Sequence, residues 1–288
     1  MLIKKGQLMK LNRINENQTR TINLDGTNNF RNLGGYIGHE GKMVKYNQFF
    51  RSDALHKLSD NDIAWLEEIG IKTIVDFRSA SEIIDNEDKM IKGSYYYHLN
   101  PKAEVAQTAS ASLANDRNKI DKLVKIANSD DGERYFANHI NDMAEQMRRL
   151  VSDPNAVQQY QKVMSLIVDN KTPIIFHCRG GKDRTGIAAM FILLALGVSK
   201  KQIFEDYLLT NINNVVRNEK RMNDYRNLTD NQNVLDYLYN LMLAKDEYLE
   251  AAFDEMIRLS GSIDNYLKHF LKLDEDKLTT LRNLYLEG

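Results

Sequence analysis

Hydrophobic residues alternate along this chain between short continuous runs and longer runs with helical spacing. The runs 71–77 and 174–176 are short, apolar and rich in β-branched residues, which predicts buried strands. Residues 48–51 and 95–99 are two further strand candidates. The segment 29–36 combines an aromatic residue with a Gly-Gly pair, which predicts a short strand that enters a tight turn.

Helical spacing dominates the stretches between and after these strands. Ser59 and Asp62 match a capping box that opens a helix, and Gly70 is placed to end it. The stretch 187–196 is almost uninterruptedly apolar and predicts a helix buried on all sides, with Gly197 as its C-cap. Apolar stripes at helical spacing then continue to the C-terminus. This order predicts an α/β fold with a mostly parallel central sheet flanked by helices and a helical C-terminal third.

The same pattern indicates the domain organisation. Residues 1–23 are polar and aperiodic, which predicts a flexible N-terminal arm. We expect residues 24–288 to form one domain. Within it, about 101–165 is predicted to be a helical insertion that acts as a lid, because 101–131 has small residues and scattered charges but weak periodicity.

Composition narrows the class of protein. The chain is 42% hydrophobic and 27% charged with a net charge of −1, which is typical of a soluble globular protein and argues against a general nucleic-acid binder. The apolar run 187–198 is shorter than the ~20 residues that span a bilayer, so we expect no integral membrane association. A single cysteine rules out an intrachain disulfide. The N-terminus has no apolar signal region, which predicts a cytoplasmic location and leaves export without a leader open. The oligomeric state is not indicated.

A polar loop, 177–186, lies between the predicted strand 174–176 and the apolar helix, and it contains the cysteine, Cys178. A strand, a glycine-containing loop and a helix N-terminus form an anion-binding cradle, because the unpaired amides at the helix start point into the loop. A cysteine at the mouth of such a cradle is a candidate nucleophile.

The spacing of Cys178 and Arg184 fits the requirements of phosphoryl transfer. The five intervening residues can wrap around a phosphate and donate amide hydrogen bonds to its three non-bridging oxygens. Gly180 and Gly181 allow the backbone to approach closely. Arg184 can donate two forked hydrogen bonds to the phosphate and favour the transition state.

Neighbouring side chains have supporting roles in this interpretation. Thr185 is placed to hydrogen-bond the sulfur as it becomes the leaving group, and His177 orients the loop from behind. The loop has a formal charge of +2, from three basic residues and one acid: Arg179, Lys182, Arg184 and Asp183. This positive charge favours the thiolate form of Cys178.

Two other interpretations of the loop have less support. A buried structural cysteine beside a glycine turn would not need this arrangement between a strand and a helix. A nucleotide-binding Walker A loop needs Ser or Thr after Gly-Lys, but Asp183 follows Lys182 here.

The loop HCRGGKDRTG resembles the active-site loop of the cysteine-dependent protein tyrosine phosphatase superfamily. It is most similar to the atypical bacterial tyrosine and lipid phosphatases whose loop reads His-Cys-x-x-Gly-Lys-Asp-Arg-Thr-Gly, a mycobacterial tyrosine phosphatase B-like group. The segments NFRNLGGY, FFRSDAL and DFRSASE resemble upstream blocks of that family in the same order, so the similarity covers about 24–100 and 155–210.

The resemblance implies a phosphocysteine intermediate, no metal or other cofactor, and a helical lid before the catalytic strand. It also implies that the loop residues Arg179 to Arg184 bind the substrate phosphate. The implied partners are phosphotyrosine proteins, sometimes phosphoserine or phosphothreonine proteins, and often phosphoinositides. A lysine at position 182 is familiar from phosphoinositide phosphatases, although it would also strengthen phosphate binding in general.

Two aspartates are candidates for the residue that donates a proton to the leaving group. The chain has no Trp-Pro-Asp motif, and its one tryptophan, Trp65, lies in a predicted helix. The family pattern implies a catalytic role for Asp183, which would otherwise form a salt bridge that stabilises the loop. Asp76 ends a buried strand, where α/β sheets place functional groups, but it would serve equally well in an ion pair with a neighbouring arginine.

Two function classes compete with a phosphatase. One is a phosphate-binding module without turnover, and the other is a rhodanese-like sulfurtransferase, which the continuation Gly-Lys-Asp-Arg-Thr-Gly disfavours. A second group of basic residues is predicted to be a solvated helix face: Arg217, Lys220, Arg221 and Arg226.

Overall fold

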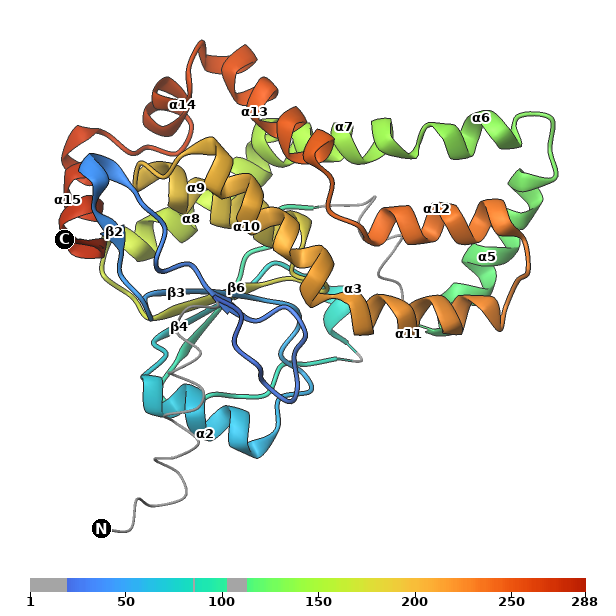
Figure 1. Cartoon of the computed structure of the whole chain (residues 1–288), viewed down its shortest axis with the longest axis horizontal. Coiled ribbons are helices and arrows are strands. Elements are labelled where there is room, and N and C mark those ends of the chain that lie inside the picture. The colour runs from blue at the N-terminus through green and yellow to red at the C-terminus, as the bar shows by residue number, and fades with distance from the viewer. Residues whose placement is uncertain (1–19, 85, 103–112) are drawn as a thin grey trace.

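The computed structural model describes residues 20–84, 86–102 and 113–288 (Figure 1). Its strands are β1 (Arg31–Asn32), β2 (Met43–Val44), β3 (Phe49–Ser52), β4 (Thr73–Asp76), β5 (Tyr95–His98), β6 (Ile174–His177) and β7 (Leu286–Glu287). The helices of the first two thirds are α2 (Asp60–Ile69), α3 (Ala80–Ile83), α5 (Leu113–Ala127), α6 (Gly132–Ala137), α7 (His139–Ser152), α8 (Pro154–Val168) and α9 (Asp183–Ala195), with one 3-10 turn at His39–Gly41. The remaining helices are α10 (Lys200–Asn213), α11 (Val215–Arg226), α12 (Gln232–Met242), α13 (Asp246–Ser260), α14 (Ile263–His269) and α15 (Glu275–Tyr285).

The central sheet has the strand order β1-β3-β6-β4-β5. The pairs β3–β6, β6–β4 and β4–β5 are parallel, and the pair β1–β3 is antiparallel. The predicted α/β fold with a mostly parallel sheet flanked by helices is therefore confirmed. The four predicted strands occur as β3, β4, β5 and β6, with ends that differ by at most two residues.

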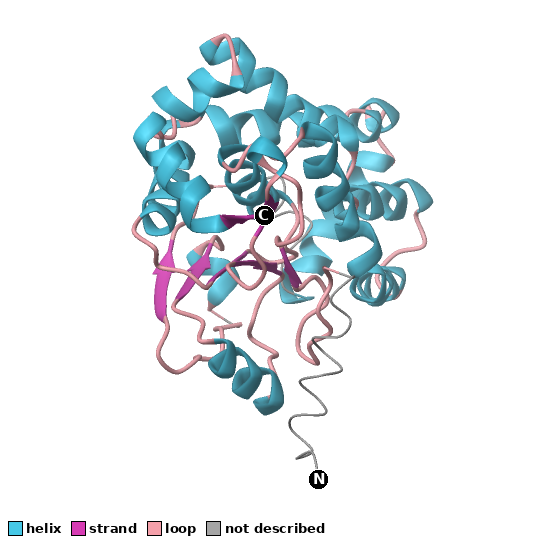
Figure 2. Cartoon of the chain, turned by 60° about the vertical axis from the view of Figure 1, so that its left-hand side comes forward, coloured by secondary structure: helices cyan, strands magenta, loops and turns pink. Residues whose placement is uncertain are grey.

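Both faces of the sheet are covered, which explains why its strands have continuous apolar runs. α2 lies on one face, where Ile74 and Ile175 pack in one apolar cluster with Ile63 of the helix. Most helices lie on the other side, as Figure 2 shows, and Phe176 packs there with the residues of α9.

Both ends of α2 follow the predicted local signals, and α8 begins with a cap of the same kind. Ser59 and Asp62 form the capping box of α2, and Gly70 ends this helix in a left-handed conformation. Asp153 caps α8, accepting a hydrogen bond from the amide of Ala156 at 3.0 Å. Local hydrogen bonding alone determines these positions, so they can be predicted without the tertiary structure.

The apolar helix begins earlier than predicted. α9 starts at Asp183 rather than near residue 187, so Arg184 and Thr185 belong to its first turn. The prediction followed hydrophobicity, but the first turn is polar because it also belongs to the loop. Almost every side chain of α9 is buried, as expected. None of the helices in the described part of the chain is long and apolar enough to cross a bilayer.

The C-terminal third is helical except for its end. β7 pairs antiparallel with β2, with Leu286 opposite Val44. The prediction of helix to the C-terminus was wrong at this point, because the pairing partner lies near the other end of the chain.

The two segments predicted to be mobile are only partly described. Residues 1–19 of the expected arm and 103–112 of the expected lid lie outside the described residues. The end of the arm is attached to the sheet region, because the amide of Asn32 donates to the carbonyl of Arg20 at 3.0 Å. The rest of the expected insertion contains α5 to α8, and α5, α6, α7, α11 and α12 form a helical lobe beside the sheet (Figure 1).

A buried ionic cluster joins β1 and β3 to α10. Asp206 of α10 accepts a hydrogen bond from Arg31 Nε at 3.0 Å and another from Arg51. All three side chains are almost fully buried. Burial disfavours the charged form of Asp206 and would raise its pKa, but the charges and hydrogen bonds of the two arginines outweigh this effect and lower the pKa of Asp206.

We predict that Asp206→Asn lowers the free energy of unfolding by about 3–5 kcal/mol, because two buried guanidinium groups lose their counter-charge. Urea denaturation measures this change. Glu205→Gln, one residue earlier on the exposed side of α10, is the matched control and should change stability by no more than about 0.5 kcal/mol. Equal effects of the two substitutions would contradict the assignment.

A second buried cluster lies behind the carboxyl ends of β4 and β6. His177 Nε2 is 2.9 Å from Asp88 Oδ2, and its Nδ1 is 3.8 Å from Asp76 Oδ1. Arg78 is within 2.8 Å of both aspartates. Burial alone would lower the pKa of His177, but the charges of Asp88 and Asp76 raise it to about 9.

This cluster predicts a pH-dependent stability. His177 has a pKa of about 9 in the folded state and about 6.5 in the unfolded state, so its contribution is complete below pH 6.5 and is lost as the pH rises through 9. We expect the free energy of unfolding to fall by up to about 3 kcal/mol over this interval. Urea denaturation at a series of pH values tests this. The slope should disappear in His177→Gln and persist in His269→Gln, which changes an exposed histidine; a flat wild-type profile would refute the prediction.

Candidate active site

The central strand β6 delivers the predicted nucleophile to the carboxyl edge of the sheet. Cys178 follows β6 directly, and its side chain is 4% exposed. Because β6 lies between β3 and β4, the segments that follow those two strands flank the cysteine loop on either side. This edge is where parallel α/β sheets bind ligands.

The carbonyl oxygens of the loop are hydrogen-bonded from outside. Asn29 Nδ2 donates to the carbonyls of Gly180 and Gly181 at 3.1 and 3.0 Å. Arg51, held by Asp206, donates through Nη2 to the carbonyl of Gly181 at 2.8 Å. These contacts turn the carbonyl side of the loop toward the protein.

The neighbouring carbonyls are bound in the same way. The amide of Ala54 donates to the carbonyl of Arg179 at 3.3 Å, and Asn214 Nδ2 donates to the carbonyl of Gly180 at 2.9 Å. The carbonyl of Lys182 accepts from Arg51 Nη2 at 3.3 Å. Four consecutive carbonyls of the loop therefore have partners outside the loop mouth.

The amides of the same loop have no such partners. Within the described ranges, no atom accepts a hydrogen bond from the backbone amides of residues 179–183. Gly181 has a φ of +65°, and a Cβ there would lie 2.4 Å from the carbonyl oxygen of Ser52. A run of unpaired amides at the start of a helix is suited to binding an anion.

Arg184 is oriented by an acid that the sequence reasoning did not identify. Glu82 of α3 accepts hydrogen bonds from Nη1 and Nη2 of Arg184 at 2.7 and 2.8 Å, and the carbonyl of Phe77 accepts from Nη1 at 3.0 Å. Nε of Arg184 is buried and has no acceptor among the described residues. The Nε proton and one Nη2 proton remain as a fork for two oxygens of an anion.

Arg184 is held in its positively charged form. Burial would lower its pKa, but the hydrogen bonds and the charge of Glu82, together with the nearby sulfur of Cys178, raise the pKa above its ordinary value. Glu82 is itself positioned by Ser79, with which it forms the capping box of α3. The segment DFRSASE thus contributes the residue that aims Arg184.

Thr185 lies in the first turn of α9, and His177 is the last residue of β6. The Thr185 hydroxyl is buried, and no described residue forms a hydrogen bond with it. His177 is fully buried behind the loop, with Nδ1 3.4 Å from the carbonyl oxygen of Cys178. Its contacts are to the protein framework and not to the loop mouth.

The two candidate acids have different surroundings. Asp183 is in the first turn of α9, 3.3 Å from the hydroxyl of Tyr207 and 3.5 Å from Nζ of Lys182. Asp76 accepts three side-chain hydrogen bonds from Arg78, the shortest at 2.8 Å. Asp76 therefore forms the ion pair that was one of its two expected roles, and it belongs to the cluster behind the sheet.

Lys182 extends away from the loop toward the C-terminal helices. Its Nζ donates to the carbonyls of Leu241 and Leu243 at 2.6 and 3.1 Å, at the end of α12. Burial lowers the pKa of Lys182, and the adjacent Asp183 opposes this shift. In this structure the ammonium group fastens the loop to α12.

A metal ion does not fit the cluster of acids near the loop. Ligand atoms of Asp76, Asp88 and His177 lie within 4.8 Å of one another. However, Arg78 already pairs with both carboxylates, and the raised pKa of His177 keeps its ring protonated. These groups satisfy one another as ion pairs.

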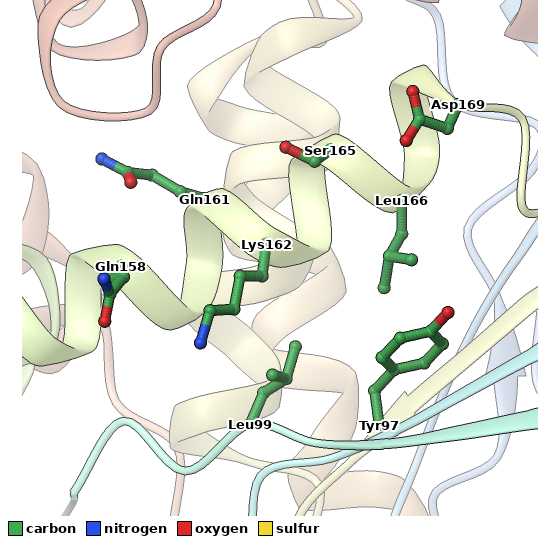
Figure 3. Close-up of a pocket in the computed structure, with 8 residues that line it drawn as sticks. All are labelled: Tyr97, Leu99, Gln158, Gln161, Lys162, Ser165, Leu166 and Asp169. Carbon is green, nitrogen blue, oxygen red and sulfur yellow. The ribbon is translucent and has the colours of Figure 1, made fainter.

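A cavity of about 440 Å³ lies elsewhere, between β5 and α8 (Figure 3). Tyr97 and Leu99 line one side of it, and Lys162 and Leu166 of α8 line the other. No residue of the cysteine loop lines this cavity, so it is separate from the candidate active site.

Four residues that hold the loop were not singled out from the sequence: Asn29, Arg51, Glu82 and Asn214. The first three lie within the segments NFRNLGGY, FFRSDAL and DFRSASE, whose resemblance to family blocks marked them as a group. Asn214 lies in the helical C-terminal third and had no such signal.

Comparison with known proteins agrees with this geometry. The sequence profile of the tyrosine phosphatase family matches residues 22–287. A Cupriavidus necator protein named as a tyrosine-protein phosphatase is 27% identical over 264 residues, covering 92% of this chain and 88% of the relative. The triple specificity protein phosphatase PtpB of Mycobacterium tuberculosis is 26% identical over 193 residues, covering 65% of this chain and 68% of the relative.

The matched region includes every residue that surrounds the loop, from Asn29 to Asn214, and extends through the helical C-terminal third. The protein belongs to the tyrosine phosphatase family.

Proposed function

We propose that this protein is a cysteine-dependent phosphomonoester hydrolase that acts through a phosphocysteine intermediate. The observation that carries the proposal is the loop in which four carbonyls are bound outward, the amides are unpaired, and Arg184 keeps two N–H groups for an anion beside Cys178. Its substrates would be phosphotyrosine proteins, with phosphoserine or phosphothreonine proteins and phosphoinositides as further candidates. The relative named as a triple specificity phosphatase supports this range.

In the first step, the thiolate of Cys178 attacks phosphorus and the bond from phosphorus to the leaving oxygen breaks. The loop amides and the fork of Arg184 bind the non-bridging oxygens, and this interaction strengthens as charge shifts onto them. Glu82 keeps the guanidinium in place throughout. A carboxylic acid donates its proton to the leaving oxygen, and we assign this role to Asp183 because it lies in the loop itself.

In the second step, water attacks the phosphocysteine and the bond between sulfur and phosphorus breaks. Asp183 takes up the proton from water, and the hydroxyl of Thr185 donates a hydrogen bond to the departing thiolate. Inorganic phosphate then leaves, and the enzyme returns to its starting state. The covalent intermediate thus divides one difficult displacement at phosphorus into two easier ones.

We predict that Cys178→Ser lowers the rate of hydrolysis of p-nitrophenyl phosphate to less than about a thousandth of the wild-type rate, because the weaker hydroxyl nucleophile replaces the thiolate. Steady-state kinetics measure the loss. The variant should still bind vanadate, since the amides and Arg184 are unchanged. A wild-type rate in the variant would exclude the mechanism.

Three measurements on the wild-type protein separate the competing functions: vanadate binding, phosphomonoester hydrolysis and sulfur transfer. A wild-type protein that binds vanadate but hydrolyses no phosphomonoester would be a phosphate-binding module. Transfer of sulfur from thiosulfate to cyanide would instead identify a sulfurtransferase.

We predict that Asp183→Asn slows the hydrolysis of alkyl phosphates by about 10²–10⁴-fold and that of p-nitrophenyl phosphate by less than tenfold, because only a poor leaving group needs the proton. Rates across a series of leaving groups measure this. Asp76→Asn is the control, and its effect should not depend on the leaving group. If instead Asp76→Asn shows the dependence and Asp183→Asn does not, Asp76 is the acid.

A further inference from the structure

Helices α11 and α10 contact the cysteine loop near its two ends. Near the start of the loop, Asn214 donates to the carbonyl of Gly180 at 2.9 Å, and the guanidinium group of Arg217 lies against the same glycine. Arg217 and Arg221 are half-buried, while the other two basic residues of α11 are exposed. The interpretation of these two arginines as part of a solvated face was therefore wrong, because tertiary packing places the start of α11 against the loop. The contact of α10 at the other end involves Asp183, the proposed general acid.

Tyr207 of α10 lies against the first turn of α9. Its side chain is buried, and a Cβ on Gly186 would be 3.0 Å from two carbons of its ring, Cδ2 and Cε2. The preceding residue, Asp206, is held in the buried ionic cluster with two arginines. The ring is thus fixed between α9 and this cluster, and its hydroxyl lies 3.3 Å from Oδ1 of Asp183.

The hydroxyl of Tyr207 acts as a donor to this carboxyl group. Burial and the negative charge of Asp183 raise the pKa of Tyr207 well above its ordinary value, so the phenol keeps its proton. Among the described residues, Oδ1 of Asp183 is the acceptor of that proton. A proton on Oδ1 would leave the buried phenol without an acceptor, so the transferable proton of the acid belongs on Oδ2. Catalytic hydrogen bonds are often as long as this one before substrate binds, and they tighten in the complex.

The other oxygen of the carboxyl group, Oδ2, has one long polar contact within the described ranges. Nζ of Lys182 is 3.5 Å from it, beyond the about 2.7–2.9 Å of a charge-assisted hydrogen bond. Lys182 instead donates to the carbonyls of Leu241 and Leu243 at 2.6 and 3.1 Å. Oδ2 is therefore the oxygen that can carry a proton and release it.

We propose that Tyr207 is a positioning residue for the general acid: its hydroxyl donates to Oδ1 of Asp183, fixes the rotation of the carboxyl group and leaves the transferable proton on Oδ2. This inference rests on the proposed phosphatase function and on Asp183 as its acid. In the first step, Oδ2 gives its proton to the leaving oxygen, and the carboxylate that forms keeps the hydrogen bond from Tyr207. In the second step, the same oxygen takes up a proton from the attacking water, so Tyr207 is unchanged over the cycle.

Tyr207→Phe tests this role, because it keeps the ring against Gly186 and removes the hydroxyl. We expect kcat/KM for alkyl phosphates to fall about tenfold, the factor that a hydrogen bond to a charged group contributes. The value for p-nitrophenyl phosphate should change by less than about twofold, because a good leaving group does not need the proton. Tyr248→Phe is the matched control. It removes the hydroxyl of another buried tyrosine, with which no described residue forms a hydrogen bond, so it should leave both values unchanged.

The double variant Tyr207→Phe/Asp183→Asn shows whether the hydroxyl acts through the acid. Its dependence on the leaving group should equal that of Asp183→Asn alone, because Tyr207 then has no acid to position. Gly186→Ala displaces the hydroxyl in another way, since the added methyl group would press on the ring of Tyr207. It takes the place of Tyr207→Phe if that protein does not show wild-type thermal melting, and the same dependence on the leaving group is expected.

A loss that is equal for all leaving groups, or no loss, overturns the proposal, because a hydroxyl with a purely structural role would not distinguish the substrates. Additive effects in the double variant also overturn it. If Asp183→Asn shows the dependence and Tyr207→Phe does not, the inference fails and the phosphatase function stands. If Cys178→Ser hydrolyses p-nitrophenyl phosphate at the wild-type rate, the proposed mechanism itself fails, whatever the variants of Tyr207 show.

Discussion

The chemistry of this protein depends on hydrogen bonds to the carbonyl oxygens of one short loop. A peptide unit has its carbonyl and its amide on opposite sides, so binding the carbonyls from outside presents the amides to the interior. Asn29, Arg51 and Asn214 supply most of these bonds. Asn29 lies two residues before β1, Arg51 lies in β3, and Asn214 directly precedes α11. The orientation of the loop amides is therefore set by residues that contact only the outer side of the loop.

A second constraint is that the guanidinium groups around the loop must each be held in one orientation. Glu82 aims Arg184 into the loop, and Asp206 holds Arg51 against the outer side of it. The pair of Asp88 and His177 lies behind the strand ends, where its charges compensate each other. These buried acids have partners of their own, so the positive charge at the loop mouth is available to a substrate.

The helical C-terminal third serves the site as well as the core. Lys182 fastens the loop to the end of α12, and Tyr207 of α10 contacts Asp183. Arg217 brings a cation from α11 to the edge of the loop. The C-terminal third, which has no comparably distinctive motif, thus shapes the surroundings of the cysteine loop.

The sequence by itself determined most of the elements and the position of the cysteine loop between a strand and a helix. Strand runs, capping residues and the Cys-x5-Arg loop are local patterns, so hydrophobic periodicity and backbone hydrogen bonding are enough to locate β6, α9, Cys178 and Arg184. Only the tertiary structure decided which distant residues serve that centre. It assigned Asp76 to an ion pair with Arg78, Glu82 to Arg184, and Arg217 to the rim of the loop. It also showed that the polar residues 183–185 begin the helix that hydrophobicity placed later. The reason is physical: a side chain's partner depends on how strands and helices pack, and sequence spacing contains little information about contacts between distant segments.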